Sequence, residues 1–154
     1  MHFLLLLQVI SLGHNLPKIY NTDSTKTVLM GFSQGASVSW ATATHFTSAA
    51  NGVSNPFAGH VCLSGVLRDE IIPSSLMEQQ QRQEPAQIYV YHGARDSVTP
   101  IKLAHRNIER AQRIGLNVRE WVEDPKLDHE LPSQGTEAYT RLNNFLESVF
   151  HSSY

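Results

Sequence analysis

The sequence contains a single cysteine, Cys62, among its 154 residues. One cysteine excludes an intramolecular disulfide and a cysteine-rich zinc site, so we expect Cys62 to be an inert buried thiol. Twelve basic and fourteen acidic residues leave no basic excess, which argues against a nucleic-acid partner. No stretch approaches the ~20 apolar residues of a membrane span. The eight histidines form no H-x-x-x-H pair and no carboxylate–histidine cluster with ligand spacing, so the sequence predicts neither a metal nor another cofactor.

The apolar N-terminus, where residues 3–10 read FLLLLQVI, resembles the short core of a signal peptide. However, no lysine or arginine precedes it, Gln8 interrupts it, and no Asn-x-Ser/Thr glycosylation acceptor occurs anywhere in the chain. We therefore expect a buried helix or strand in a cytoplasmic protein. The alternative is a secreted protein from which residues 1–13 are cleaved.

Short apolar runs alternate with longer helical patterns along a chain of ordinary globular composition, 41% hydrophobic and 17% charged. The glutamine-rich segment 78–84 predicts an exposed loop or a frayed helix end. Strands are predicted at residues 27–30, 60–63, 88–91 and 118–122, and helices at residues 35–50, 100–114 and 136–150. This alternation predicts an α/β fold with a mostly parallel sheet between two helical layers. In such sheets, functional groups gather at the carboxyl ends of the strands.

A candidate nucleophile, Ser33, lies in the sequence Gly31-Phe32-Ser33-Gln34-Gly35, which fits the G-x-S-x-G elbow. The elbow places a serine on a sharp strand-to-helix turn, and we expect Gly31 and Gly35 to approach each other so closely that both must be small. The following helix offers backbone N–H groups to a developing oxyanion, and that of Gln34 is the natural donor. A glycine-rich turn that serves packing alone is the alternative.

A serine nucleophile needs an imidazole base that is oriented by a carboxylate, and in this class of fold the chain order is Ser, Asp or Glu, then His. Asp96 follows a predicted strand and is our candidate acid, although it fits a turn or helix-cap aspartate as well. Glu123 and Asp124 are weaker choices because they lie so near the candidate base. That base is His129, which lies between the last predicted strand and the last predicted helix. The other histidines are out of order or lie within helices, strands or the tail.

Four segments together resemble the phospholipase/carboxylesterase family of α/β-hydrolases, which includes the acyl-protein thioesterases. They are the elbow segment KTVLMGFSQG at residues 26–35, the strand-end segment LSG at 63–65, the segment His92-Gly93-x-x-Asp96-x-Val98-x-Pro100, and His129-Glu130. The resemblance implies a metal-free serine hydrolase that acts on small-molecule or lipid acyl esters or thioesters. Fungal-type serine hydrolases with a similar GFSQG elbow are the second resemblance.

The departure from this family lies before the elbow. Family members carry an H-G-x-G type loop there, which supplies a second oxyanion N–H, whereas none of the 32 residues before Ser33 reads His-Gly. We therefore expect residues 1–154 to form a single, N-terminally truncated domain, the C-terminal portion of an α/β-hydrolase fold. The elbow strand then becomes an apolar sheet edge. We expect the N-terminal segment 3–10, a second copy of the chain or a partner chain to cover this edge.

Two functions remain open at this point. The first is a serine hydrolase that uses a Ser33-His129-Asp96 triad and forms an acyl-enzyme. The second is a hydrolase-like domain with little or no catalysis, which acts in binding or needs a partner chain to complete its sheet.

Overall fold

The computed structural model describes residues 2–23, 26–48, 55–68 and 86–151. The predicted strands and helices are confirmed, with boundaries that differ by one or two residues where both ends are described, while segment 78–84 lies outside the described residues. In chain order the elements are α1 (His2–Tyr20), β1 (Val28–Phe32), α2 (Gln34–Ser48), β2 (Gly59–Leu63), β3 (Gln87–Gly93), α3 (Ile101–Arg113), β4 (Asn117–Asp124) and α4 (Glu137–His151).

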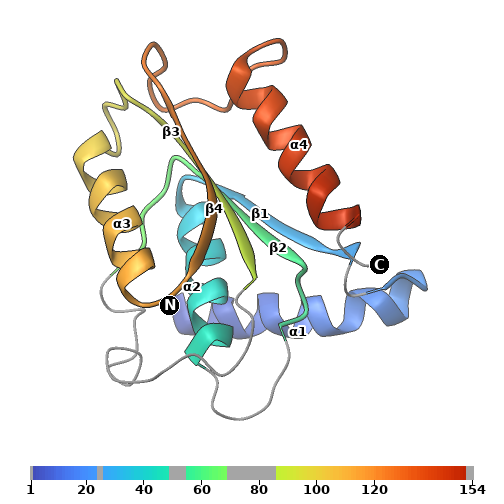
Figure 1. The fold of residues 1–154 in the computed structure, drawn as a ribbon. Coiled ribbons are helices and arrows are strands. Elements are labelled where there is room, and N and C mark those ends of the chain that lie inside the picture. Colours follow the sequence, from blue (N-terminus) through green and yellow to red (C-terminus); the bar gives the residue numbers. More distant parts are fainter. Residues whose placement is uncertain (1, 24–25, 49–54, 69–85, 152–154) are drawn as a thin grey trace.

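The four strands form one parallel sheet in the order β1-β2-β3-β4. Helices α2 and α3 cover one face of this sheet and α4 covers the other (Figure 1). The predicted three-layer α/β architecture is therefore confirmed.

Alternation along β3 shows how the sequence builds these layers. Ile88 and Val90 pack with Trp40 of α2 and Ala111 of α3 on one face. Tyr89 and Tyr91 point to the opposite face, where they pack with α4. Successive side chains of a strand point to opposite faces, so a strand that is covered on both sides must be apolar throughout. The continuous apolar run of β3 meets this requirement.

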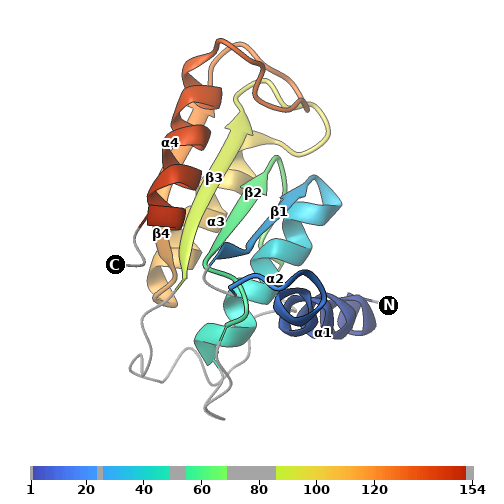
Figure 2. The same cartoon turned by 90° about the vertical axis from the view of Figure 1, so that its right-hand side faces the viewer.

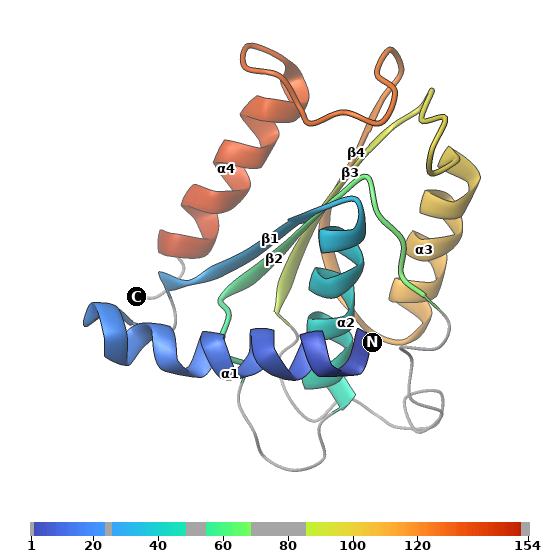
Figure 3. The same ribbon diagram turned by 180° about the vertical axis from the view of Figure 1, so that it is seen from behind.

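Helix α1 departs from two expectations. It is a helix, but its outer side is not buried, since the side chains of Leu7 and Leu12 are 43% and 53% exposed. It packs against α2 rather than alongside β1 (Figures 2 and 3), with the ring of His14 against that of Phe46. Met30 of β1 consequently remains 48% exposed at the edge of the sheet. The prediction that segment 3–10 covers the elbow strand is therefore wrong, because α1 packs against α2 instead.

None of the described helices is both long and apolar enough to cross a membrane. At the opposite end of the sheet from α1, the chain leaves β1, β3 and β4 through three turns that lie side by side (Figure 1). These turns contain Ser33, Asp96 and His129 respectively.

Candidate active site

Ser33 occupies the turn between β1 and α2 with a φ of +54°. This left-handed conformation is unfavourable for a residue with a Cβ atom and is held here by hydrogen bonds on both sides. The Ser33 N–H donates to the carbonyl of Leu63 at 2.8 Å, and the Ser33 carbonyl accepts from the N–H of Ala36 at 3.1 Å. The strained turn thus links the end of β1 to the end of β2 and to the first turn of α2.

The two glycines of the elbow differ in how closely they are packed. A Cβ on Gly31 would lie 2.6 Å from the backbone nitrogen of Ala36 and still closer to the carbonyl carbon and oxygen of Gly35. A Cβ on Gly35 would meet no atom of the described residues within 4 Å. The prediction is therefore confirmed for Gly31 and wrong for Gly35. The carbonyl of Gly35 fills the space that a Cβ of Gly31 would occupy, so only the side-chain position of Gly31 is blocked.

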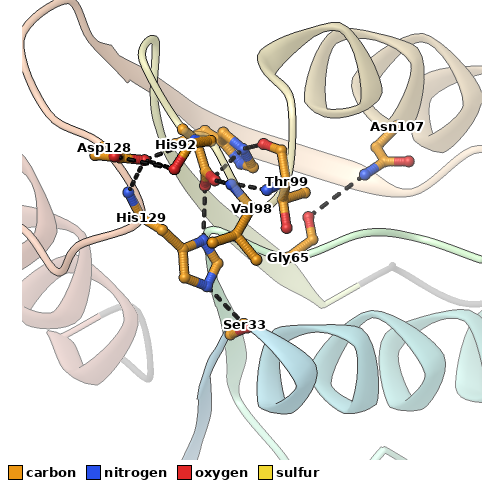
Figure 4. Close-up of polar contacts among 10 residues, drawn as sticks. Ser33, Gly65, His92, Val98, Thr99, Asn107, Asp128 and His129 are labelled. Carbon is orange, nitrogen blue, oxygen red and sulfur yellow. Dashed lines mark hydrogen bonds and ion pairs between the residues drawn. The ribbon is translucent and has the colours of Figure 1, made fainter.

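The structure brings the side chains of Ser33, His129 and Asp96 together in one chain of hydrogen bonds. His129 Nε2 lies 2.9 Å from Ser33 Oγ, and His129 Nδ1 lies 2.8 Å from Asp96 Oδ2 (Figure 4). The carboxylate can only accept at Nδ1, so Nδ1 carries the hydrogen and Nε2 presents a lone pair to the serine hydroxyl. This tautomer is the one in which an imidazole can take the proton of a serine.

Asp96 is held by its own loop as well as by His129. Its Oδ1 accepts the backbone N–H groups of Val98 at 2.9 Å and Thr99 at 2.6 Å. The carboxyl group is fully buried, whereas the His129 side chain is 15% exposed. The Asp96 carboxylate therefore serves both predicted roles, since it stabilises its own turn and also binds His129. Because both oxygens are engaged, the orientation of Asp96 toward His129 is restricted.

His92 is a component of this network that the sequence reasoning did not assign. Its fully buried ring lies beneath the Asp96 loop, with Nε2 2.7 Å from the carbonyl oxygen of Thr99 and 3.2 Å from Asp96 Oδ2. Both neighbours are acceptors, so this nitrogen carries a hydrogen. His92 thus donates to the loop that holds Asp96. The His92-Gly93 pair was visible in the sequence, but its role depends on this contact within the fold.

The loops that carry Asp96 and His129 are docked on each other at Gly93. A Cβ at this position would lie 2.9 Å from the carbonyl carbon of Leu127 and closer to the carbonyl oxygens of Leu127 and Asp128. Next to it, the N–H of Ala94 donates to the carbonyl of Asp124 at 2.7 Å, and that of Arg95 donates to Leu127 at 3.0 Å. These backbone bonds hold the two loops against each other.

The remaining candidates lie apart from this chain of hydrogen bonds. Glu123 contacts His105 at 2.8 Å, and Asp124 accepts the N–H of Lys126 at 2.9 Å. Nδ1 of His129 faces Asp96 instead of either acid. Gln34 is the first residue of α2 and follows Ser33 directly, which is the position predicted for the oxyanion donor. Burial raises the pKa of the Cys62 thiol to about 12, so the prediction of an inert buried thiol agrees with the structure.

Apolar surface borders the site on the side of β1. The ring of Phe32 lies 4.9 Å from the ring of His129, measured between centroids, and Phe32 is 36% exposed. Within the part of the chain that the structure describes, no group of three His, Cys, Asp or Glu side chains is arranged to hold a metal ion.

Comparison with known proteins identifies the family of this chain. A family model described as phospholipase/carboxylesterase matches residues 8–149. The chain belongs to this phospholipase/carboxylesterase family. No curated protein sequence matches the chain.

Solved structures related to this phospholipase/carboxylesterase chain share its fold at low sequence identity. Arabidopsis thaliana SOBER1 is 16% identical with a TM-score of 0.71, over 96% of this chain and 64% of that one. Bacillus cereus carboxylesterase is 16% identical with a TM-score of 0.67, over 97% of this chain and 62% of that one. Zea mays acyl-protein thioesterase 2 is 22% identical with a TM-score of 0.58, over 79% and 55%. The chain therefore spans 55% to 64% of the length of these three solved structures.

Proposed function

We propose that this chain is a serine hydrolase that cleaves carboxylic esters or thioesters through Ser33, His129 and Asp96. The observation that carries the proposal is the continuous hydrogen-bond chain from Asp96 Oδ2 through the His129 ring to Ser33 Oγ. Membership of the phospholipase/carboxylesterase family supports the same chemistry. The proposed substrate is a small-molecule or lipid acyl ester or thioester. We also propose that residues 1–154 act as one domain, which corresponds to the C-terminal part of an α/β-hydrolase.

The proposed reaction proceeds in two halves. Ser33 Oγ attacks the acyl carbon while His129 Nε2 takes the hydroxyl proton, and Asp96 stabilises the resulting imidazolium. His129 then gives this proton to the departing alcohol or thiol, which leaves an acyl group on Ser33. In the second half, a water molecule loses a proton to His129 and attacks the acyl carbon. Collapse of the second intermediate releases the carboxylic acid and returns the proton to Ser33.

The backbone N–H of Gln34 is the proposed donor to the oxyanion of both intermediates, because it begins the helix that follows the nucleophile. Loss of one oxyanion donor typically lowers turnover by ~10²–10³-fold. With the Gln34 N–H as its only oxyanion donor, the enzyme would turn over slowly although Ser33 remains reactive.

The second candidate function follows from the exposed edge of β1 and from the coverage of 64% of SOBER1. In that case the chain acts in binding, or a partner chain completes the sheet and restores turnover.

Covalent labelling with a fluorophosphonate, followed by steady-state hydrolysis of an acyl ester and an acyl thioester, separates these functions. We expect labelling at Ser33 that is lost in Ser33→Ala and strongly reduced in His129→Ala. Labelling together with turnover by the isolated chain supports the hydrolase. Labelling without turnover supports the second candidate, and wild-type protein that does not react with the probe contradicts the proposed nucleophile.

A further inference from the structure

Asp128 bridges the two loops that carry the proposed acid and base. Its Oδ1 accepts the backbone N–H of Ser97 at 2.6 Å and the backbone N–H of His129 at 2.8 Å. The Ser97 hydroxyl lies 2.9 Å from Oδ1 and 3.0 Å from Oδ2 of the same carboxylate (Figure 4). Ser97 directly follows Asp96, and Asp128 directly precedes His129. One exposed carboxylate thus joins the immediate neighbours of both residues.

Two other hydrogen bonds between these loops run through the backbone and join Ala94 to Asp124 and Arg95 to Leu127. Both reach the His129 loop before residue 128. Without the Asp128 carboxylate, the hydrogen bonds among the described residues would tie residues 128–130 to the Asp96 loop only through the His129 ring. Hydrogen bonds to an ionised acceptor are roughly twice as strong as those between neutral groups, so the Asp128 bridge is well suited to restrict the loop at this point.

We propose that Asp128 is a positioning residue, which holds the Asp96 loop and His129 in one unit so that the imidazole stays between the carboxylate and Ser33. This inference rests on the proposed function of Ser33, Asp96 and His129. Asp128 itself touches neither the proposed nucleophile nor the ring nitrogens of His129.

The charge of Asp128 adds an effect that a purely steric contact would not have. Hydrogen bonds from the backbone N–H and the hydroxyl of Ser97 lower the pKa of the Asp128 carboxyl group, with a smaller contribution from the His129 charge. Asp128 is therefore ionised at neutral pH beside His129. This negative charge strengthens the hydrogen bonds that Asp128 accepts from the Ser97 and His129 N–H groups.

Three variants separate the bridge from the charge, and the pseudo-first-order rate of fluorophosphonate labelling of Ser33 is measured for each at neutral pH. Asp128→Ala removes the bridge and the charge. Asp128→Asn keeps an acceptor oxygen for Ser97 and for the His129 N–H but removes the charge. Ser97→Ala removes the hydroxyl contacts and keeps the charge. Glu109→Gln removes an exposed acid of α3 and serves as the control.

We expect Asp128→Ala to slow labelling by about 10- to 100-fold, the range for a misplaced reacting group, while circular dichroism shows an unchanged fold. Asp128→Asn recovers most of the rate, because its amide oxygen still accepts from the Ser97 and His129 N–H groups. Ser97→Ala, which keeps the bond from the Ser97 N–H to Asp128, loses less than Asp128→Ala, and Glu109→Gln labels at the wild-type rate. A wild-type rate in Asp128→Ala, or equal losses in Asp128→Ala and Asp128→Asn, overturns the proposal.

Hydrogen exchange of the Ser97 amide provides a test that does not depend on a reactive Ser33. Faster exchange in Asp128→Ala than in Glu109→Gln supports the bridge, and equal exchange overturns it. If wild-type protein fails to react with the probe, the proposed function fails while this measurement still decides the role of Asp128.

Discussion

Alanine at Gly31 and alanine at Gly35 add the same methyl group to the two ends of the elbow, yet the structure predicts opposite results. At Gly31 the new Cβ lies 2.6 Å from the nitrogen of Ala36 and closer to the carbonyl of Gly35, all of them backbone atoms. Ordinary contacts begin near 3.4 Å, so the start of α2 must move away from β1 by about 1 Å, and such a displacement costs on the order of 100-fold in rate. Overpacking of this kind also costs about 1–3 kcal/mol of stability.

Gly35→Ala meets open space instead, since no atom of the described residues lies within 4 Å of the new Cβ. Position 35 is helical in the structure, and replacing glycine by alanine at a compatible position stabilises a protein by about 0.4–1 kcal/mol. We therefore expect Gly35→Ala to label at the wild-type rate and to unfold at slightly higher urea concentration.

Urea unfolding followed by circular dichroism, together with the labelling rate of Ser33, provides the comparison of the two variants. Gly31→Ala should show a lower unfolding midpoint and labelling about 100-fold slower than wild type. Equal damage in both variants, or a harmless Gly31→Ala, would refute the reasoning from the Cβ positions.

Three further predictions concern His92, His60 and Met30. His92→Leu removes the donor to Thr99 and should slow labelling of Ser33 about tenfold, whereas His92→Gln keeps an N–H at similar reach and should label faster than the leucine variant. Burial lowers the pKa of His60 to about 3, so the unfolded chain binds a proton that the folded chain does not. The contribution of His60 to the unfolding free energy should therefore fall by about 1.4 kcal/mol per pH unit on acidification from about pH 6.5 to 3, and urea titrations of His60→Gln should lack this slope. We expect the exposed edge strand to make the wild-type chain associate at high concentration. Met30→Lys places a charge on this edge and should reduce the association measured by light scattering; equal scattering by both proteins would contradict this.

Most of the fold could be predicted from local patterns because its strands are covered on both faces. The apolar runs of β2 and β3 reflect that burial, and the helical period of α4 follows from its single buried face. Segment 3–10 shows the limit of this reasoning. An apolar run predicts burial only where a partner exists, and α1 has α2 on one side while Leu7 and Leu12 face outward.

The site could be predicted in part because chain order and strand ends constrain it. Ser33, Asp96 and His129 each follow a strand, so a parallel sheet brings them to one edge, and the structure places them within hydrogen-bond distance. The contributions of His92 and Asp128 could not be predicted in this way. Each depends on which oxygen atom its side chain meets across two loops, and sequence spacing carries no information on that contact.

The sheet has a consequence for how the molecule is made, because each strand pairs with the next strand in the chain. As the polypeptide leaves the ribosome, every new strand finds its neighbour already synthesised, and domains generally fold in this direction during translation. The proposed nucleophile Ser33 is in place early, but His129 follows it by 96 residues and docks only after β4 has joined the sheet. A nascent chain that stops before residue 129 would contain Ser33 without its proposed base. Reactivity of Ser33 therefore reports that synthesis has passed the last strand and that the loop after it has closed.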